Sequence, residues 1–380
     1  MIYLDYNATT PIDSEVLDDM LPFLKDKFGN ASSITHQAGW LAKDGVETAI
    51  EQICSLLHCD SKEIVFTSGA TESINMAIKG VFEIYKRKGN HIITCKTEHK
   101  AVLDVCASIE KKGGRVSYLN VDKNGLVDLE QLKKEISDQT ILVSIMYVNN
   151  ETGVIQPIDE IAKIVHEHNS IFMSDATQAV GKLPIDLEND RIDLMAFSAH
   201  KFYGPKGVGG LYIRRKKPRV ILSPLIEGGG HQRGLRSGTL NVPGIVGLGA
   251  ACELANKEMQ ANEEKVRRLR NLLESKFSFL PDVMFNGSGT NRLYNVSNIC
   301  FKGVSSEQII NAVKSKVALS TGSACTSENQ QPSHVLTAMG LSPSESHASL
   351  RFSLGKYTTE LEIDDTAHLI IEKVKSVRSS

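Results

Sequence analysis

The stretch Ser198-Ala199-His200-Lys201-Phe202-Tyr203-Gly204-Pro205-Lys206-Gly207 decides how this sequence is interpreted. It follows an apolar run over residues 192–197 that predicts a buried strand, and its Gly and Pro residues predict a loop. Lysine is strongly hydrated and is seldom placed at the end of a buried strand. One reason for such a place is Schiff-base formation, because a desolvated amine attacks an aldehyde. Taken alone, Lys201 is better explained as a solvated loop lysine, so the rest of the sequence must decide.

The composition describes a globular protein with sizeable cores. The chain has 380 residues, of which 41% are hydrophobic and 23% charged, a length that fits two domains or one large and one smaller domain. The net charge of −2 argues against direct nucleic-acid binding. No apolar run reaches membrane-spanning length, and the N-terminus does not resemble a secretory signal, so we expect a cytoplasmic protein that does not enter a membrane.

The seven cysteines form no Cys-x-x-Cys pair, so we expect reduced thiols and no metal site. Most of them, Cys54 included, fall in apolar or helical patterns and are expected to pack. Cys59 falls in a loop, and Cys325 has a different surrounding, which is described below.

Short apolar runs alternate with helical periodicity between residues 60 and 220, which is the βα pattern of an open α/β sheet. The expected strands are 64–68, 91–95, 116–120, 141–150, 171–175, 194–198 and 210–214. The expected helices between them are 72–88, 100–112, 128–136 and 159–168. From about Val246 a long charged helix and shorter mixed elements predict a second, smaller α+β domain.

Polar residues follow the expected strands, at the edge where open α/β sheets bind ligands. After the first strand comes Thr67-Ser68-Gly69-Ala70-Thr71-Glu72-Ser73, where free N–H groups at a helix start favour an anion. An ordinary Ser/Thr helix cap is the alternative, and for this motif alone it is the better one.

The other strand ends carry groups suited to a flat, charged ring. His99 could cover the face of such a ring or cap a helix. Asn149-Asn150-Glu151 places polar groups where a buried strand opens to a cavity. Asp175 precedes Ala176-Thr177-Gln178 and needs a cationic partner if it is buried, and a protonated pyridine nitrogen would be such a partner. An equally good explanation is that Asp175 caps the N-terminus of a helix. With Lys201, these groups form the set that pyridoxal 5′-phosphate needs.

The sequence as a whole resembles the cysteine desulfurases, in the class V aminotransferase group of fold-type-I pyridoxal-phosphate enzymes, and is most similar to their bacterial IscS/NifS type. The matching motifs are 3–11, 66–73, 97–101, 175–178, 198–207, 236–240 and 320–327. The resemblance implies a large domain over 15–250 with a seven-stranded, mainly parallel sheet. It implies a small α+β domain built from 1–14 and 251–380, carrying a mobile catalytic loop at about 320–335.

The resemblance also implies the cofactor contacts. Lys201 forms the Schiff base with pyridoxal phosphate and then moves protons, assisted by His99, which stacks on the ring. Asp175 pairs with the ring nitrogen, and Gln178 bonds the phenolic oxygen. The implied phosphate site consists of Ala70 through its backbone, Thr71, Ser198, His200 and, from the neighbouring subunit of an obligate homodimer, Thr239.

The same resemblance implies the substrate, L-cysteine, and the sulfur chemistry. Asn150 and Arg351 bind the substrate carboxylate, for which a planar guanidinium is suited. The Cys325 thiolate attacks the substrate sulfur, which leaves alanine and a persulfide on Cys325. Small and polar residues surround Cys325, which fits a mobile loop better than a buried free cysteine.

The implied sulfur acceptor is a protein of iron–sulfur cluster assembly, tRNA thiolation or DNA phosphorothioation. Longer relatives continue beyond the position of Ser380 with a tail that helps to dock the iron–sulfur scaffold protein, so the choice stays open. Two other functions also remain open: another fold-type-I enzyme, such as an aminotransferase or a selenocysteine lyase, and a scaffold that keeps the fold without catalysis.

Overall fold

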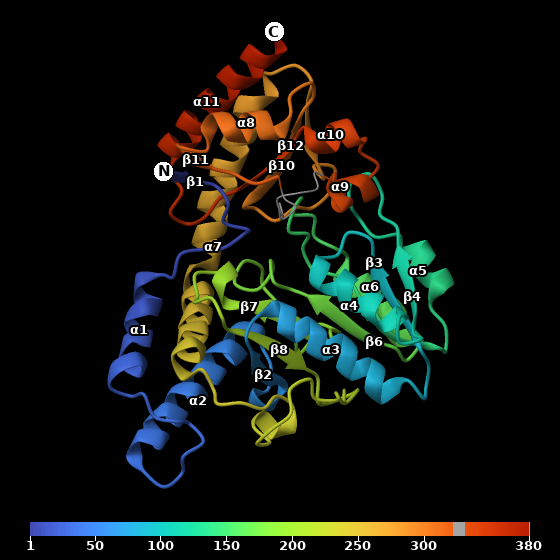
Figure 1. Cartoon of the computed structure of the whole chain (residues 1–380), viewed down its shortest axis with the longest axis vertical. Coiled ribbons are helices and arrows are strands. Elements are labelled where there is room, and N and C mark those ends of the chain that lie inside the picture. The colour runs from blue at the N-terminus through green and yellow to red at the C-terminus, as the bar shows by residue number, and fades with distance from the viewer. Residues whose placement is uncertain (322–330, 380) are drawn as a thin grey trace.

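The computed structural model describes residues 1–321 and 331–379, which form two parts joined by one long helix (Figure 1). The larger part contains a seven-stranded sheet with the order β2-β8-β7-β6-β5-β3-β4. Its strands are β2 (Ile64–Thr67), β3 (His91–Cys95), β4 (Arg115–Leu119), β5 (Thr140–Ser144), β6 (Ile171–Asp175), β7 (Leu194–Ser198) and β8 (Gly209–Ile213). Strand β8 alone runs opposite to the other six strands. The expected mainly parallel sheet of seven strands is therefore confirmed.

Helices cover both faces of this sheet, because strands that are buried on both sides expose apolar side chains to each face. The helices are α1 (Ser14–Lys25), α2 (Gln37–Leu57), α3 (Ala70–Tyr85), α4 (Lys100–Glu110), α5 (Leu129–Glu135), α6 (Ile158–Glu167) and the first half of α7 (Val242–Ser278). Helices α3 and α4 share one apolar core with the sheet. Helices α2, α6 and α7 belong to the core on the other face. The result is a three-layer α/β architecture.

The expected strand over 141–150 is too long. The ladder of β5 ends at Ser144, but the chain stays extended, since Ile145 N–H donates to Met173 O and Tyr147 N–H donates to Asp175 O. The apolar residues 145–148 therefore continue the edge of the sheet into a binding region instead of lengthening the regular strand.

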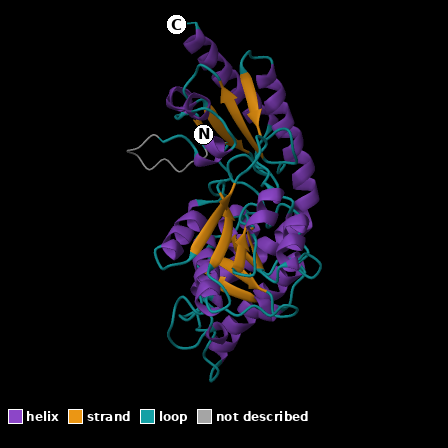
Figure 2. Ribbon diagram, turned by 90° about the vertical axis from the view of Figure 1, so that its right-hand side faces the viewer, coloured by secondary structure: helices purple, strands orange, loops and turns teal. Residues whose placement is uncertain are grey.

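The smaller part lies around a three-stranded antiparallel sheet with the order β12-β10-β9, above the larger sheet in Figure 2. Its strands are β9 (Val283–Asn286), β10 (Val296–Phe301) and β12 (Ser349–Ser353), and its helices are α8 (Ser306–Val313), α9 (His334–Ala338), α10 (Pro343–His347) and α11 (Glu360–Arg378). The N-terminal strand β1 (Ile2–Tyr3) pairs with β11 (Val317–Ala318) in this part. The division at residue 250 stays a prediction, and it would fall within the continuous helix α7.

Among the helices that the structure describes, none combines the length and the apolar character that crossing a membrane requires.

Candidate active site

A cavity of about 1040 Å³ opens where the two parts of the molecule meet, at the C-terminal ends of β2, β6 and β7. Ten of the residues singled out in the sequence line it: Ala70, Thr71, His99, Asn150, Asp175, Gln178, Ser198, His200, Lys201 and Arg351. They come from five stretches of the larger part and one strand of the smaller part. The fold thus brings together groups as far apart in the sequence as Ala70 and Arg351.

One part of the cavity carries groups that can bind an anion. Helix α3 begins after Gly69, which has no side chain to cap the first N–H groups and adopts φ +150°. A Cβ atom at Gly69 would lie 3.4 Å from Ser198 Oγ, so the hydroxyl group of Ser198 stands beside this turn. Burial, together with Lys201 and Lys206, lowers the pKa of His200 to about 4. His200 is therefore a neutral hydrogen-bonding group near pH 7, and its Nδ1 lies 3.1 Å from Thr9 Oγ1.

Lys201 ends the short 3₁₀ turn Ala199–Lys201 that follows β7. Its Nζ donates to Asn7 O and to Ala8 O, each at 2.8 Å, so the amine is held against the N-terminal segment. Burial and the neighbouring Arg351 lower the pKa of Lys201 to about 8, against the opposite effect of Asp175. A solvated loop lysine would have neither these two contacts nor this shift.

Asp175 and His99 each make a local capping contact, and each also lines the cavity, so their roles toward a ring stay predictions. Asp175 Oδ1 accepts from Thr177 N–H at 3.0 Å and from Thr177 Oγ1–H at 2.5 Å, as a turn-capping aspartate does. Within the described residues no hydrogen bond engages its Oδ2, which leaves an acceptor on the cavity side of a buried carboxylate.

His99 is the N-cap of α4, because its Nδ1 accepts from Ala101 N–H at 3.1 Å. Desolvation lowers the pKa of His99, against the opposite effect of the Asp175 carboxylate. With Nδ1 as the acceptor, the proton of the neutral ring is assigned to Nε2. His99 therefore lines the cavity with Nε2 left as a donor, while Nδ1 caps the start of α4.

The smaller part of the molecule contributes a guanidinium group to the cavity wall. Arg351, on β12, is buried and pairs with Asp5 Oδ1 at 2.7 Å, and it also donates from Nη1 to Asn150 O at 3.1 Å. The Asn150 carbonyl also accepts from Asn7 Nδ2. The sequence did not reveal Asp5 as a partner of the guanidinium, since 346 residues separate the two. A ligand carboxylate that binds Arg351 would have to share the guanidinium with Asp5 or displace the Asp5 carboxylate from it.

Lys182 is the main site residue that the sequence analysis missed. It is only 6% exposed, and its Nζ donates to Gln178 Oε1 at 2.7 Å. Gln178 Nε2 in turn donates to Asn7 O, the same carbonyl that accepts from Lys201. Burial and the charges of Lys201 and Arg351 lower the pKa of Lys182 to about 7. The sequence offered only the four-residue spacing between Gln178 and Lys182, and such a spacing is too common to indicate a functional lysine.

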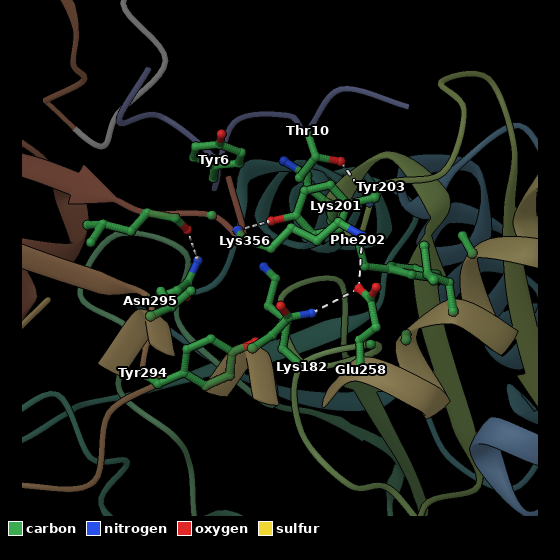
Figure 3. Close-up of a pocket in the computed structure, with 18 residues that line it drawn as sticks. Tyr6, Thr10, Lys182, Lys201, Phe202, Tyr203, Glu258, Tyr294, Asn295 and Lys356 are labelled. Atoms are coloured by element: carbon green, nitrogen blue, oxygen red, sulfur yellow. Dashed lines mark hydrogen bonds and ion pairs between the residues drawn. The ribbon is translucent and has the colours of Figure 1, made fainter. Parts of the chain in front are cut away.

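Figure 3 shows the space behind the two lysines. This smaller cavity, of about 30 Å³, is lined by Lys182 and Lys201 together with Tyr294, Asn295 and Lys356. Asn295 donates to Asn7 Oδ1 and to Leu354 O. The N-terminal segment is therefore bonded to both parts of the molecule just beneath Lys201.

Cys325 lies outside the described residues, but the chain on both sides of it borders the cavity. Thr321 and His334 line the cavity. Arg351 N–H donates to Ser320 O at 2.8 Å, Ser333 Oγ–H donates to the buried Glu151 Oε2 at 2.5 Å, and His334 Nε2 lies 2.9 Å from Glu98 O. Thr239 is not among the residues that line the cavity, and its side chain is exposed.

Comparison with protein families agrees with this geometry. The model of the family described as "Aminotransferase class-V" matches residues 2–365. The chain is 50% identical over 378 residues to the cysteine desulfurase IscS of Anaeromyxobacter sp. (strain Fw109-5), covering 99% of this chain and 93% of that protein. It is also 50% identical over 380 residues to the cysteine desulfurase IscS of Buchnera aphidicola subsp. Baizongia pistaciae (strain Bp), covering 100% and 94%.

Solved structures give the same result for the fold. A structure described as a NifS-like protein superposes with a TM-score of 0.91 at 39% identity, covering 99% of both chains. The structure of SspA in complex with cysteine gives a TM-score of 0.83 at 36% identity, covering 94% of this chain and 100% of that one. DndA from Streptomyces lividans gives 0.80 at 38% identity, covering 92% and 98%.

Proposed function

The chain belongs to the class-V aminotransferase family and is a cysteine desulfurase, and we propose how its residues perform that reaction. In this proposal Lys201 holds pyridoxal phosphate, and sulfur is transferred from L-cysteine to Cys325. The observation that carries this proposal is the convergence of an uncapped helix start, a buried carboxylate and an amine of lowered pKa on one cavity. These are the groups that match the phosphate, the ring nitrogen and the aldehyde of one molecule.

The described residues fit this cofactor. The N–H groups at the start of α3, with Thr71, Ser198 and His200, would hold the phosphate. Asp175 Oδ2 would accept from a protonated ring nitrogen, and the ring of His99 would cover one face of the pyridine. Gln178, whose amide is held by hydrogen bonds with Lys182 and Asn7, would orient the cofactor. Bound pyridoxal phosphate supplies an aldehyde that condenses with amines and a ring that withdraws electrons from the substrate Cα.

The remaining groups act on the substrate. Arg351 binds the carboxylate of L-cysteine, next to Asn150. Lys201, whose pKa lies near 8, can accept and return a proton at the substrate Cα near neutral pH. Cys325 attacks the substrate sulfur as a thiolate: its sulfur bonds to the substrate sulfur as the bond from that sulfur to Cβ breaks, and Cβ is protonated to give alanine. The position of Thr321 and His334 on the cavity supports this role.

The test is to incubate the purified protein with pyridoxal phosphate, L-cysteine and a reducing thiol and to measure alanine and sulfide. We expect equal amounts of both. Replacement Cys325→Ala should abolish the persulfide and leave cofactor binding intact, and Cys106→Ala, in a buried helix position, is the matched control. Amino transfer to a keto acid without sulfide would instead indicate an aminotransferase. No absorbance from bound cofactor would indicate a scaffold.

We also propose a homodimer in which Thr239 of the partner subunit completes the phosphate site. Exposed apolar side chains close together in the sequence support a second copy: Phe28 and Ile34 are 76% and 79% exposed, and Trp40 in α2 and Leu24 in α1 are also exposed. Sedimentation should show a dimer. Thr239→Val should weaken cofactor affinity without changing the dimer, and an unchanged affinity would remove Thr239 from the site.

The sulfur acceptor is proposed to be a protein of iron–sulfur assembly, thiolation or phosphorothioation in the cytoplasm. The six described cysteines are all free, which fits a reducing compartment. Labelling Cys325 with [³⁵S]cysteine and following the label into co-purifying proteins would identify the acceptor. Transfer to small thiols alone would contradict a dedicated protein acceptor.

A further inference from the structure

Two thiols lie in contact at the C-terminal end of α2, outside the active site. The Sγ atoms of Cys54 and Cys59 are 3.7 Å apart, and both side chains are half-buried. Neither residue lines the cavity that holds Lys201. The sequence predicted packing for Cys54 and a loop for Cys59, and gave no reason to pair them.

The backbone explains why these two side chains meet. His58 ends α2 in the left-handed conformation, with φ +49°. The N–H groups of His58 and Cys59 both donate to Cys54 O, the second at 3.4 Å. This is the Schellman type of helix end, which places side chains five positions apart against each other. The two sulfurs are therefore held together by a rigid helix terminus, where most proteins place an apolar pair.

The contact gives the two thiols different character. The Cys59 thiol donates its hydrogen bond toward Cys54 Sγ, which lowers the pKa of Cys54 and raises that of Cys59. The other described cysteines, Cys95, Cys106, Cys252 and Cys300, are buried, and burial raises the pKa of each. Among the thiols in the described part of the chain, only this pair combines solvent access with a neighbouring thiol.

We propose that Cys54 and Cys59 form a dithiol site that hydroperoxides oxidise to an intramolecular disulfide. In the first step the Cys54 thiolate attacks hydrogen peroxide, the O–O bond breaks, and Cys54 becomes a sulfenic acid as hydroxide leaves and is protonated to water. In the second step Cys59 sulfur attacks Cys54 Sγ, the S–O bond breaks, and a second water leaves with the Cys59 proton. Two thiols and one peroxide thus give one disulfide and two waters.

The experiment uses the full chain loaded with pyridoxal phosphate and treated with increasing hydrogen peroxide. Remaining thiols are blocked with iodoacetamide under denaturing conditions, and the protein is digested with trypsin. Both cysteines fall in the fragment 44–62, which ends at Lys62, while Cys106 falls alone in the fragment 101–111 as the internal control. We expect fragment 44–62 to lose two hydrogen atoms and both alkyl groups, and to recover them after dithiothreitol, while fragment 101–111 stays alkylated.

Single variants separate a dithiol site from simple packing. In Cys59→Ser, Cys54 should stop at the sulfenic acid and react with dimedone. In Cys54→Ser the fragment should stay largely alkylated, because the contact with the Cys54 thiol is gone but burial still raises the pKa of Cys59 and no second thiol can resolve a sulfenic acid. The proposal is overturned if fragment 44–62 of the unchanged chain stays doubly alkylated over the peroxide range that fully oxidises free cysteine. It is equally overturned if that fragment forms only intermolecular disulfides or sulfinic acids.

Discussion

Two walls of the same cavity are built in different ways. The strand-end wall consists of Ala70, Asp175, Gln178, Ser198 and Lys201, all at or just beyond the C-terminal ends of sheet strands or at the start of the helix that follows. The crossing wall consists of Asp5, Asn7 and Arg351, which come from the N-terminal segment and from β12. The strand-end wall offers the groups that match the cofactor, and the crossing wall offers the cation that matches a carboxylate. Binding of the cofactor and binding of the substrate should therefore be separable by mutation.

The largest effect is expected on the strand-end wall. Lys201→Ala should remove the Schiff-base absorbance and reduce alanine formation by about 10⁴-fold or more, because both the covalent attachment and the proton transfer at Cα are lost. Lys206→Ala removes an exposed lysine from the same loop and should keep the absorbance. A Lys201→Ala protein that retains the Schiff-base band would contradict the assignment.

The crossing wall should affect substrate binding without affecting the cofactor. Arg351→Lys should raise KM for L-cysteine by about 10- to 100-fold, because an ammonium group cannot make the bidentate contact with a carboxylate. Asp5→Asn should lower KM severalfold, since its carboxylate competes for the same guanidinium. Steady-state kinetics with absorbance spectra check both. If Arg351→Lys lowers cofactor occupancy instead, the two walls are not separable.

The lowered pKa of Lys201 predicts how the apoprotein reacts with pyridoxal phosphate. Only the neutral amine attacks the aldehyde, so the rate of Schiff-base formation should fall about tenfold per pH unit below a pKa of about 8 and level off above it. Stopped-flow absorbance between pH 6 and pH 10 measures this profile. A rate that keeps rising to pH 10 would mean that the amine titrates as an ordinary exposed lysine.

The buried Lys182 ammonium group should lower the free energy of unfolding, although its hydrogen bond holds Gln178 of the strand-end wall in place. Its pKa in the folded state, about 7, lies below that of an unfolded lysine, so the folded protein binds fewer protons between pH 7 and about 10. The stability of the unchanged chain should therefore rise over this window, and below pH 7 the full penalty applies. Lys182→Met should remove the part of that rise that Lys182 causes, most clearly between pH 7 and pH 8, while Lys201 still contributes above about pH 8.

At pH 6.5 we expect Lys182→Met to increase the free energy of unfolding by about 1–3 kcal/mol, because the lost burial penalty exceeds the lost hydrogen bond to Gln178. Chemical denaturation at pH 6.5 and pH 9 makes the comparison, provided that the dimer state is the same. A variant that is less stable at both pH values would show that the ammonium group stabilises the fold.

The two walls also differ in how far the sequence predicts them. The strand-end wall follows from local patterns, since each group comes just after an apolar run and parallel strands align their ends at one edge. The Asp5–Arg351 pair depends on β1 pairing with β11 and on Asp5 bridging to Ser353, and no periodicity reports such long-range contacts. Lys182 was missed because a lysine four residues from Gln178 is ordinary until its burial is known.

The most direct test of the account is to find which lysine carries the cofactor, because Lys182 and Lys201 border the same small cavity and both have lowered pKa values. The holoenzyme is reduced with sodium borohydride, which fixes the Schiff base, and is digested with trypsin. Cleavage at Arg191 separates the two lysines. The account predicts that mass spectrometry finds the pyridoxyl group on Lys201 alone; a pyridoxyl group on Lys182, or on neither lysine, would contradict it.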